Sequence, residues 1–345
     1  MTGSFTKTVR VSLGEGGYDI VIRQGGLKDV KNIFDLNRKV MVVSDDTVPE
    51  RYRKTVEAAG LEGYCFVFRH GEREKNLETY GKILSLMLEK GFSRHDCVVA
   101  AGGGISGDIA GFAAASYMRG IDFYNVPTTL LAQVDSSIGG KTAVNLDGFK
   151  NMVGAFHQPK KVLIDPEVLE TLPKRQLANG MAEALKVACA LDGELFKIFL
   201  EKDPYEEIGL IIERSLLCKK AVVEKDEKEN GLRKVLNFGH TIGHGIESTV
   251  LDGTLLHGEC VALGMLPMCS DGVREKLLKC LEKLGLPTVF DFDKEKVLRA
   301  AAHDKKAGKT TVSTVFVPEI GEFEFRELTL EQLGERLKLI GRHAE

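Results

Sequence analysis

Three of the chain's eight histidines lie in the stretch 233–257, and each has a glycine beside it. Imidazole is the commonest metal ligand and proton carrier at neutral pH. His240 and His244 are four residues apart, so on a helix they would share one face. Two half-buried core histidines would give the same spacing, so the pair alone leaves both roles open. His257, with an arginine and an asparagine nearby, favours a functional site.

Charged side chains also occur in two strongly apolar helical patterns. Glu183 and Lys186 are three residues apart in the stretch 175–191, so they share a helix face. Their neighbours are almost all apolar, which predicts a buried helix. Because burying a charge is costly unless a partner or metal compensates it, we expect a functional pair rather than a solvated one. Lys219 continues the apolar stripe of the stretch 205–224, where extension of the side chain to solvent is the alternative.

A glycine-rich turn follows the apolar run 97–101. It reads Gly-Gly-Gly-Ile-Ser-Gly-Asp at residues 102–108 and precedes a helical pattern. Glycines at such a turn let backbone amides approach a pyrophosphate at the positive end of a helix. The spacing differs from the usual Gly-x-Gly-x-x-Gly, so a tight strand–helix turn without a ligand stays open.

The stretch 126–151 combines hydroxyl groups, a carboxylate, two adjacent glycines and several basic side chains. Polar side chains at this density, together with loop glycines, suit a sugar or phosphate ligand. A hydroxyl-rich surface loop is the alternative, but such loops rarely carry so many apolar residues between the polar ones.

Length and composition limit the classes of protein. A chain of 345 residues favours two domains. A net charge of −3 argues against a surface that coats nucleic acid, so anion binding would need a local group of cations. Seven cysteines without a Cys-x-x-Cys pair indicate reduced thiols. No apolar leader or membrane-length run occurs, and we expect a cytoplasmic protein.

Hydrophobic periodicity predicts two parts that position these residues. A hairpin pattern at 6–23 is followed by short apolar runs that alternate with helical patterns, as expected for a parallel, doubly wound α/β sheet. We expect its strands at 39–44, 64–68, 97–101, 123–126 and 161–165. The remainder is mainly α-helical, with a β segment at 310–325 and helices at 175–191, 205–224, 233–249, 257–268, 272–284 and 328–341. The predicted domains are 1–165 and 166–345.

Taken together, the motifs closely resemble the 3-dehydroquinate synthase family of the shikimate pathway, which serves aromatic amino acid biosynthesis. The resemblance runs from about residue 40 to Lys306. It rests on Gly-Gly-Gly-x-x-Gly-Asp-x-x-Gly-Phe at 102–112, Pro-Thr-Thr-Leu-Leu-Ala-Gln-Val-Asp-Ser-Ser-Ile-Gly-Gly-Lys at 127–141, Glu-Ala-Leu-Lys at 183–186, Asn-Phe-Gly-His-Thr-Ile-Gly-His at 237–244 and His-Gly-Glu-x-Val-Ala-x-Gly-Met at 257–265.

The resemblance implies an NAD-binding α/β domain and a helical metal- and substrate-binding domain. It implies one divalent metal ion, zinc or cobalt, with Glu183, His240 and His257 as ligands, and it assigns His244 to the substrate. Three protein ligands leave the open position that a catalytic zinc needs. The implied NAD contacts are Glu72, Lys75, Gly103, Gly104, Gly107, Asp108, Thr128, Thr129, Lys141, Lys150 and Thr171.

Further roles follow from the same resemblance. Catalytic roles fall to Asp135, Lys141, Lys186, Arg233, Asn237 and His244, and further substrate contacts to Lys150, Asn151, Lys219 and Lys305. Arg119 would reach the active site of the neighbouring subunit, which implies a homodimer. The implied reaction turns 3-deoxy-D-arabino-heptulosonate 7-phosphate into 3-dehydroquinate and phosphate by transient oxidation, β-elimination, re-reduction and aldol closure.

The chain departs from the family pattern at Val187, where an aromatic residue is common, and at His157, where tyrosine is frequent. Neither position belongs to the implied ligand or substrate sets. Three other functions compete: a secondary-metabolism sugar-phosphate cyclase, a metal-dependent polyol dehydrogenase and a non-catalytic sugar-phosphate sensor. Retention of Arg233, Asn237, His244 and Lys305 favours the shikimate substrate, because its carboxylate needs cationic partners.

Overall fold

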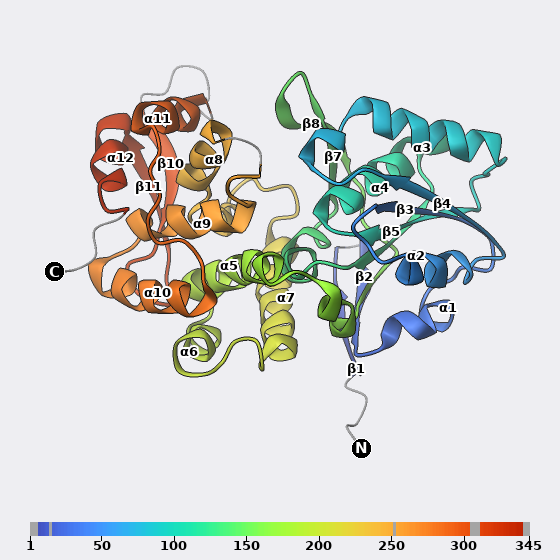
Figure 1. Cartoon of the computed structure of the whole chain (residues 1–345), viewed down its shortest axis with the longest axis horizontal. Helices are drawn as coiled ribbons and strands as arrows, with labels where there is room; N and C mark the ends of the chain where they lie inside the picture. Colours follow the sequence, from blue (N-terminus) through green and yellow to red (C-terminus); the bar gives the residue numbers. More distant parts are fainter. Residues whose placement is uncertain (1–5, 14–15, 251–252, 304–310, 341–345) are drawn as a thin grey trace. The chain divides into compact units, whose positions relative to one another are not determined.

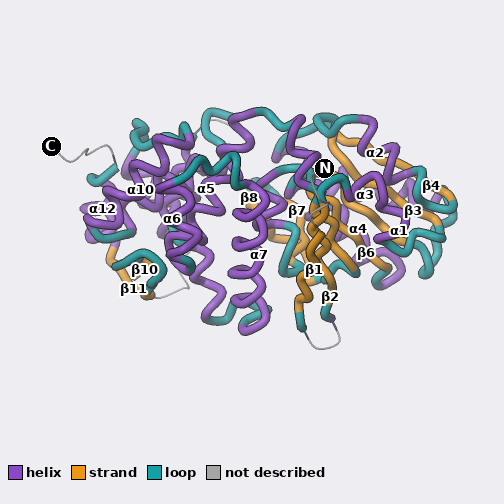
Figure 2. The backbone as a smooth tube through the Cα atoms, turned by 90° about the horizontal axis from the view of Figure 1, so that it is seen from below, coloured by secondary structure: helices purple, strands orange, loops and turns teal. Residues whose placement is uncertain are grey.

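The computed structural model describes residues 6–13, 16–250, 253–303 and 311–340 (Figure 1). The chain divides into two compact units, Met1–Pro173 and Lys174–Glu345. The sequence-based boundary of 165/166 lies eight residues earlier than this division. Figure 2 shows that the longer strands belong to the first unit, whereas the second is mainly helical.

Among the described residues, the first unit contains a seven-stranded sheet with the order β1-β2-β9-β6-β5-β3-β4. β1 is antiparallel to β2, and the other neighbouring pairs are parallel. This confirms the predicted hairpin and the doubly wound α/β fold. The strands are β1 (Thr6–Val11), β2 (Tyr18–Arg23), β3 (Lys39–Asp45), β4 (Glu62–Phe68), β5 (Cys97–Gly102), β6 (Asp122–Pro127) and β9 (Lys161–Ile164).

Both faces of this sheet are covered (Figure 1). Met41 and Val43 of β3 belong to one apolar cluster, and Val40 and Val42 belong to another, as expected when alternate side chains point to opposite faces. The first cluster includes residues of α3 (Leu77–Glu89) and α4 (Gly104–Ser116); the second includes residues of α1 (Val30–Ile33) and α2 (Glu50–Glu57). Because these strands run parallel, their carboxyl ends lie at one edge of the sheet, where the loops that follow them can bind a ligand.

The stretch 126–151, for which the sequence indicated a ligand loop, is more ordered than expected. Residues Ala132–Ser136 form one π-helical turn. A two-stranded hairpin follows, β7 (Lys141–Leu146) with β8 (Phe149–Phe156). Two residues of its tip, Asp147 (φ 51°) and Gly148 (φ 82°), lie in the left-handed region that a tight hairpin turn requires.

The second unit is mainly helical, as predicted. Its helices are α5 (Lys174–Leu191), α6 (Gly193–Glu201), α7 (Ile208–Lys225), α8 (His240–Thr249), α9 (His257–Met265), α10 (Asp271–Leu284), α11 (Lys294–His303) and α12 (Leu330–Leu337). The predicted β segment is the hairpin of β10 (Thr311–Phe316) and β11 (Glu324–Thr329). Helices α6 and α11 were not predicted.

The single helix predicted at 233–249 is wrong. A 3₁₀ helix spans Leu232–Asn237, and α8 begins at His240. Gly239 between them has φ 77°, a left-handed conformation that ends one helix and redirects the chain into the next. His240 and His244 nevertheless lie on one helix, as their spacing predicted.

Within the described part of the chain, no helix combines the length and apolar character that crossing a membrane requires. The seven cysteines are all described, none of them forms a disulfide, and five of them are buried. Burial raises the pKa of Cys97 and Cys269 to about 12, so these thiols stay protonated and unreactive.

Candidate active site

Glycines bring the histidine-bearing helices α8 and α9 together. A Cβ on Gly264 of α9 would lie 2.0 Å from the carbonyl oxygen of Gly239, and one on Gly243 would lie 3.0 Å from the carbonyl oxygen of Cys260. The two backbones can therefore approach only because these residues lack side chains. This close packing places His240, at the start of α8, near His257, at the start of α9.

The start of α9 is also anchored to α5. The amide of Gly258 donates to Asn179 Oδ1 at 2.6 Å. Arg175 donates to both carboxylate oxygens of Glu259, each at 2.7 Å. Glu259 Oε2 in turn accepts from the backbone amide of Leu256 at 2.8 Å and caps the helix. Since α5 carries Glu183, these contacts fix His257 relative to that carboxylate.

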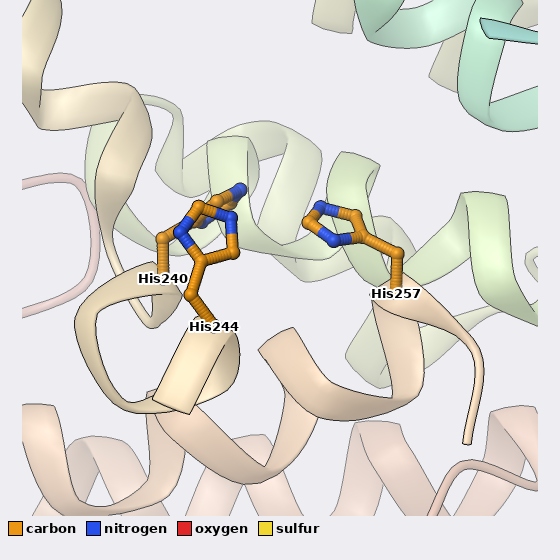
Figure 3. A group of neighbouring side chains, drawn as sticks. All are labelled: His240, His244 and His257. Carbon is orange, nitrogen blue, oxygen red and sulfur yellow. The ribbon is translucent and has the colours of Figure 1, made fainter. Parts of the chain in front are cut away.

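Three imidazoles converge in the second unit (Figure 3). Ligand nitrogens of His240, His244 and His257 all lie within 4.8 Å of one another, the one such group of metal-ligand type found among the described residues. Glu183 Oε1 lies 3.4 Å from His257 Nε2 and 3.7 Å from His240 Nε2. In a tetrahedral zinc site two nitrogen or oxygen ligands lie about 3.3 Å apart, given bonds of about 2.0–2.1 Å. These contacts therefore have the spacing of a metal centre.

Glu183 is the most constrained member of this group. Its side chain is 1% exposed, and Lys186 Nζ donates to its Oε2 at 2.6 Å. Its Oε1 is buried but accepts no hydrogen bond from any described residue. The two imidazoles contact this oxygen only with ion-pair geometry, at 3.4 and 3.7 Å. A buried carboxylate oxygen without a hydrogen bond is costly, and a cation between it and the two imidazoles would satisfy it. The residues present thus fit a divalent ion that takes nitrogen and oxygen ligands.

The protonation states agree with this arrangement. Burial would raise the pKa of Glu183, but Lys186 and the two imidazoles hold it well below its usual range. Burial and the charge of Lys186 lower the pKa of His240 to about 3, so its ring is neutral. Burial would lower the pKa of His257 too, but Glu183 and Glu247 outweigh it and raise the pKa to about 10. A metal ion would therefore displace a proton from His257.

Each of these two imidazoles has a partner on its other nitrogen. His240 Nδ1 lies 3.1 Å from the carbonyl oxygen of Phe238, which can only accept, so Nδ1 carries the proton and Nε2 the lone pair. His257 Nδ1 lies 3.3 Å from Glu247 Oε2. Glu247 was not predicted from the sequence, although its spacing from His240 and His244 (i, i+4, i+7) places all three on one face of α8.

Two other predicted site residues of the second unit are buried cations. Lys219 on α7 is 5% exposed and Arg233 is 3% exposed, so Lys219 does not extend to solvent. Asp226 Oδ2 accepts from the backbone amide of Arg233 at 2.9 Å, and Nη1 of Arg233 donates to the carbonyl of Glu227. Asn237 donates to Glu229 at 2.8 Å. The predicted residue Lys305 lies outside the described residues.

In the first unit, most of the predicted NAD residues follow strands that end at one edge of the sheet. α4 begins at Gly104 with Gly103 as its N-cap, and no side chain caps its first amides. A Cβ on Gly103 would lie 3.1 Å from Thr129 Cγ2, and one on Gly104 would lie 3.1 Å from Ser136 Oγ. The first amides of this helix are uncapped, and the glycines leave them accessible. Such amides can bind a pyrophosphate, so this edge of the sheet fits a dinucleotide.

The structure brings three further predicted residues together. Lys75, which is 5% exposed, donates to Asp108 Oδ2 and to Asn151 Oδ1, each at 2.5 Å. Asn145, which was not predicted as a site residue, donates to Glu72 Oε1 at 2.8 Å.

The remaining predicted residues lie on neighbouring elements. Gly107 is on the first turn of α4, Thr128 follows β6, and Asp135 is in the π-helical turn. Lys141 and Lys150 are exposed on the β7–β8 hairpin. Thr171 ends the 3₁₀ helix Pro166–Thr171, where its hydroxyl donates to the carbonyl of Val168 at 3.1 Å.

Solved structures share this fold over nearly the whole chain. A 2-deoxy-scyllo-inosose synthase complexed with carbaglucose-6-phosphate, NAD+ and Co2+ has a TM-score of 0.88 at 25% identity, and the match covers 96% of this chain and 99% of that one. The 2-epi-5-epi-valiolone synthase of Streptomyces hygroscopicus subsp. jinggangensis 5008, with NAD+ and Zn2+ bound, has a TM-score of 0.86 at 29% identity and covers 95% and 98%. The fold is that of the sugar phosphate cyclases.

Sequence comparison narrows this class to one family. The family models described as 3-dehydroquinate synthase N-terminal and C-terminal match residues 65–179 and 180–307. The 3-dehydroquinate synthases of Streptococcus sanguinis (strain SK36) and Lactococcus lactis subsp. cremoris (strain MG1363) are each 42% identical to this chain, over 96% of it and 99% of their own length. The chain belongs to the 3-dehydroquinate synthase family and is an enzyme with that family's activity.

Proposed function

We propose that the enzyme converts 3-deoxy-D-arabino-heptulosonate 7-phosphate into 3-dehydroquinate and phosphate with a resident NAD and one divalent cation, zinc or cobalt. The observation that carries the proposal is the buried Glu183 Oε1, which accepts no hydrogen bond from a described residue and lies beside two imidazole nitrogens. When bound, the two cofactors supply transient oxidation at C5 and Lewis-acid polarisation of the C4 and C5 hydroxyls.

In this proposal Glu183, His240 and His257 hold the cation, and a position stays open for the substrate. Lys186 occupies Oε2 of Glu183 and so leaves Oε1 to the cation. His244 is exposed, and its ring centroid lies 5.1 Å from that of His240. An imidazole so placed can hold and return a proton beside the bound sugar.

The substrate carries a carboxylate and a phosphate, whereas the protein is acidic overall. Its binding therefore needs local cations, of which guanidinium groups fit planar anions best. We assign substrate contacts to Lys141, Lys150, Asn151, Lys219, Arg233, Asn237 and Lys305, with Asp135 orienting the hydroxyls. A dehydrogenase acting on a neutral polyol would not need this set of cations.

NAD contacts are assigned to the carboxyl edge of the sheet in the first unit. They are Glu72, Lys75, Gly103, Gly104, Gly107, Asp108, Thr128, Thr129, Lys141, Lys150 and Thr171. The amides at the start of α4 would neutralise the pyrophosphate, and the carboxylates would accept from ribose hydroxyls. Because the reaction leaves NAD unchanged overall, these contacts serve retention rather than exchange.

We further propose a homodimer in which Arg119 reaches the neighbouring active site. Met118 and Arg119 are both exposed and have φ values of 49° and 71°, a conformation that non-glycine residues adopt at a cost. Two such residues in succession support a fixed presentation of the arginine. Seven described cysteines without a disulfide fit a reducing compartment, so we place the enzyme in the cytoplasm.

The proposed function is tested by measuring phosphate release from the seven-carbon substrate with and without a chelator. We expect phosphate release to need NAD in substoichiometric amounts and to leave no accumulated NADH. Release should stop when the chelator is added and return when zinc or cobalt is restored. Stoichiometric NADH would instead indicate a dehydrogenase. Equal turnover of a sugar phosphate that lacks the carboxylate would favour a secondary-metabolism cyclase.

Arg233→Ala should weaken binding of the substrate's anionic end. A charge-assisted hydrogen bond is worth about 1.5–3 kcal/mol, so we expect KM to rise by roughly 10- to 100-fold. Steady-state kinetics measure this effect, and Lys234→Ala, an exposed neighbour on the same 3₁₀ helix, is the control. Unchanged KM and kcat in Arg233→Ala would remove this residue from the site.

A further inference from the structure

The β7–β8 hairpin changes its pairing register at Asn145. Val144 pairs with Val153 and Leu146 pairs with Phe149, so the ladder skips Asn145 on β7 and residues 150–152 on β8. The backbone amide of Asn145 donates instead to the carbonyl of Lys75 at 2.8 Å. Irregularities of this kind redirect side chains and are common beside active sites. Here the irregularity turns Asn145 toward the segment that begins at Glu72.

The side-chain amide of Asn145 joins two groups through opposite hydrogen-bonding roles. Its Nδ2 donates to Glu72 Oε1 at 2.8 Å, and its Oδ1 accepts from the backbone amide of Asn151 at 2.9 Å. Asn151 has φ 59°, a left-handed conformation that needs support in a residue other than glycine. A primary amide supplies a donor and an acceptor at once, which neither a carboxylate nor an alkyl group can do.

Lys75 closes these contacts into a ring. Its buried ammonium donates to the Asn151 side chain and to Asp108, each at 2.5 Å. The hydrogen bonds thus run from Glu72 through Asn145 and Asn151 to Lys75, and Lys75 follows Glu72 by one turn of the same short 3₁₀ segment. Glu72 and Lys75 of this ring are assigned above to NAD, and Asn151 is assigned to the substrate.

We propose that Asn145 is a positioning residue that couples NAD binding to substrate binding, by holding Asn151 in register with Glu72 and Lys75. This inference rests on the proposed function, because that function assigns the two ends of the ring to their ligands. Ordering of Glu72 and Lys75 by the dinucleotide fixes Asn151 for the sugar phosphate, and coupling of this kind is reciprocal. Asn145 acts through these partners and contacts neither ligand itself.

The decisive variant is Asn145→Asp, which keeps an acceptor for the Asn151 amide but places a carboxylate against that of Glu72. We expect the dissociation constant of NAD+, measured by titration calorimetry, and the KM for the sugar phosphate each to rise by about 10-fold or more, within the usual range of coupling between sites. The double variant Asn145→Asp with Glu72→Gln restores a donor–acceptor pair with the roles exchanged. It should recover both constants to within about threefold of Glu72→Gln alone.

Asn76→Asp is the matched control. Asn76 lies opposite Asn145 across an isolated bridge and caps α3 through its Oδ1, a role that aspartate also fills. The variant loses the hydrogen bond from Asn76 Nδ2 to the carbonyl of Arg73 at 2.7 Å but keeps every contact of Asn145. It adds the same negative charge near the same segment, so it measures simple repulsion of the anionic dinucleotide. Asn145→Ala, which removes both hydrogen bonds without adding charge, is expected to weaken both ligands and provides a second variant if the aspartate variant folds poorly.

The outcomes separate this inference from the proposed function. A wild-type protein that binds no NAD+ would contradict the proposed function. A wild-type protein that binds NAD+, with Asn145→Asp and Asn145→Ala no weaker for either ligand than Asn76→Asp, would overturn the coupling. Failure of Glu72→Gln to rescue Asn145→Asp would show that the two side chains act independently, which also contradicts it.

Discussion

His257→Ala is expected to lose its metal and its activity together. The substitution removes one of the three proposed ligands and leaves Glu183 Oε1 without the imidazole that lies 3.4 Å away. Because even contacts outside a ligand set are commonly worth 10- to 100-fold in metal affinity, we expect the loss of a ligand to exceed about 100-fold. The measurement is zinc per chain by mass spectrometry after dialysis against metal-free buffer, with phosphate release assayed on the same samples.

His244→Ala is the informative comparison, since geometry alone does not separate His244 from the two assigned ligands. Nitrogens of all three imidazoles lie within 4.8 Å of one another, yet His244 is exposed whereas His240 is 9% exposed. If His244 serves the substrate, His244→Ala should keep its zinc and lose turnover. Full zinc occupancy in His257→Ala, or loss of zinc in His244→Ala, would reverse the assignment.

The sequence predicted the architecture well where one physical signal dominated. Alternation of apolar runs with helical patterns gave the parallel sheet of the first unit, because both faces of such strands must be buried. The break at Gly239 was missed, because the periodic apolar pattern continues across it while the helical backbone conformation does not. The helix α6, which packs against α5 and α10, was also missed, since it is only nine residues long.

The candidate site divides in the same way. Apolar flanks predicted that Glu183 and Lys186 are buried, and both are 1% exposed. Spacing could place His240 and His244 on one helix, but His257 joins them only through the close approach of α8 and α9. Asn145 could not be found from its neighbours, because its role arises from a change of register that depends on segments remote in sequence.

Lys186→Met should destabilise the metal-free protein strongly. The side chains of Lys186 and Glu183 are 2% and 1% exposed, and removal of one partner leaves a buried carboxylate without its ammonium. Breaking a buried pair in this way costs about 3–5 kcal/mol. For a unit of this size the loss corresponds to roughly 6–20 °C in the melting temperature measured by calorimetry in the presence of a chelator.

Lys197→Met is the matched control for this loss. Lys197 and Glu194 on α6 have the same i, i+3 spacing and the same 2.6 Å contact, but their side chains are 58% and 69% exposed. Water therefore replaces the lost partner, and the melting temperature should stay unchanged.

Zinc should restore much of the stability of Lys186→Met, because a divalent cation at Glu183 Oε1 compensates the same carboxylate. It should add no comparable increment to Lys197→Met beyond what it gives the wild type. Equal melting temperatures for the two metal-free variants would mean that the buried pair does not stabilise the second unit, and a loss in Lys186→Met that zinc leaves untouched would place the cation away from Glu183.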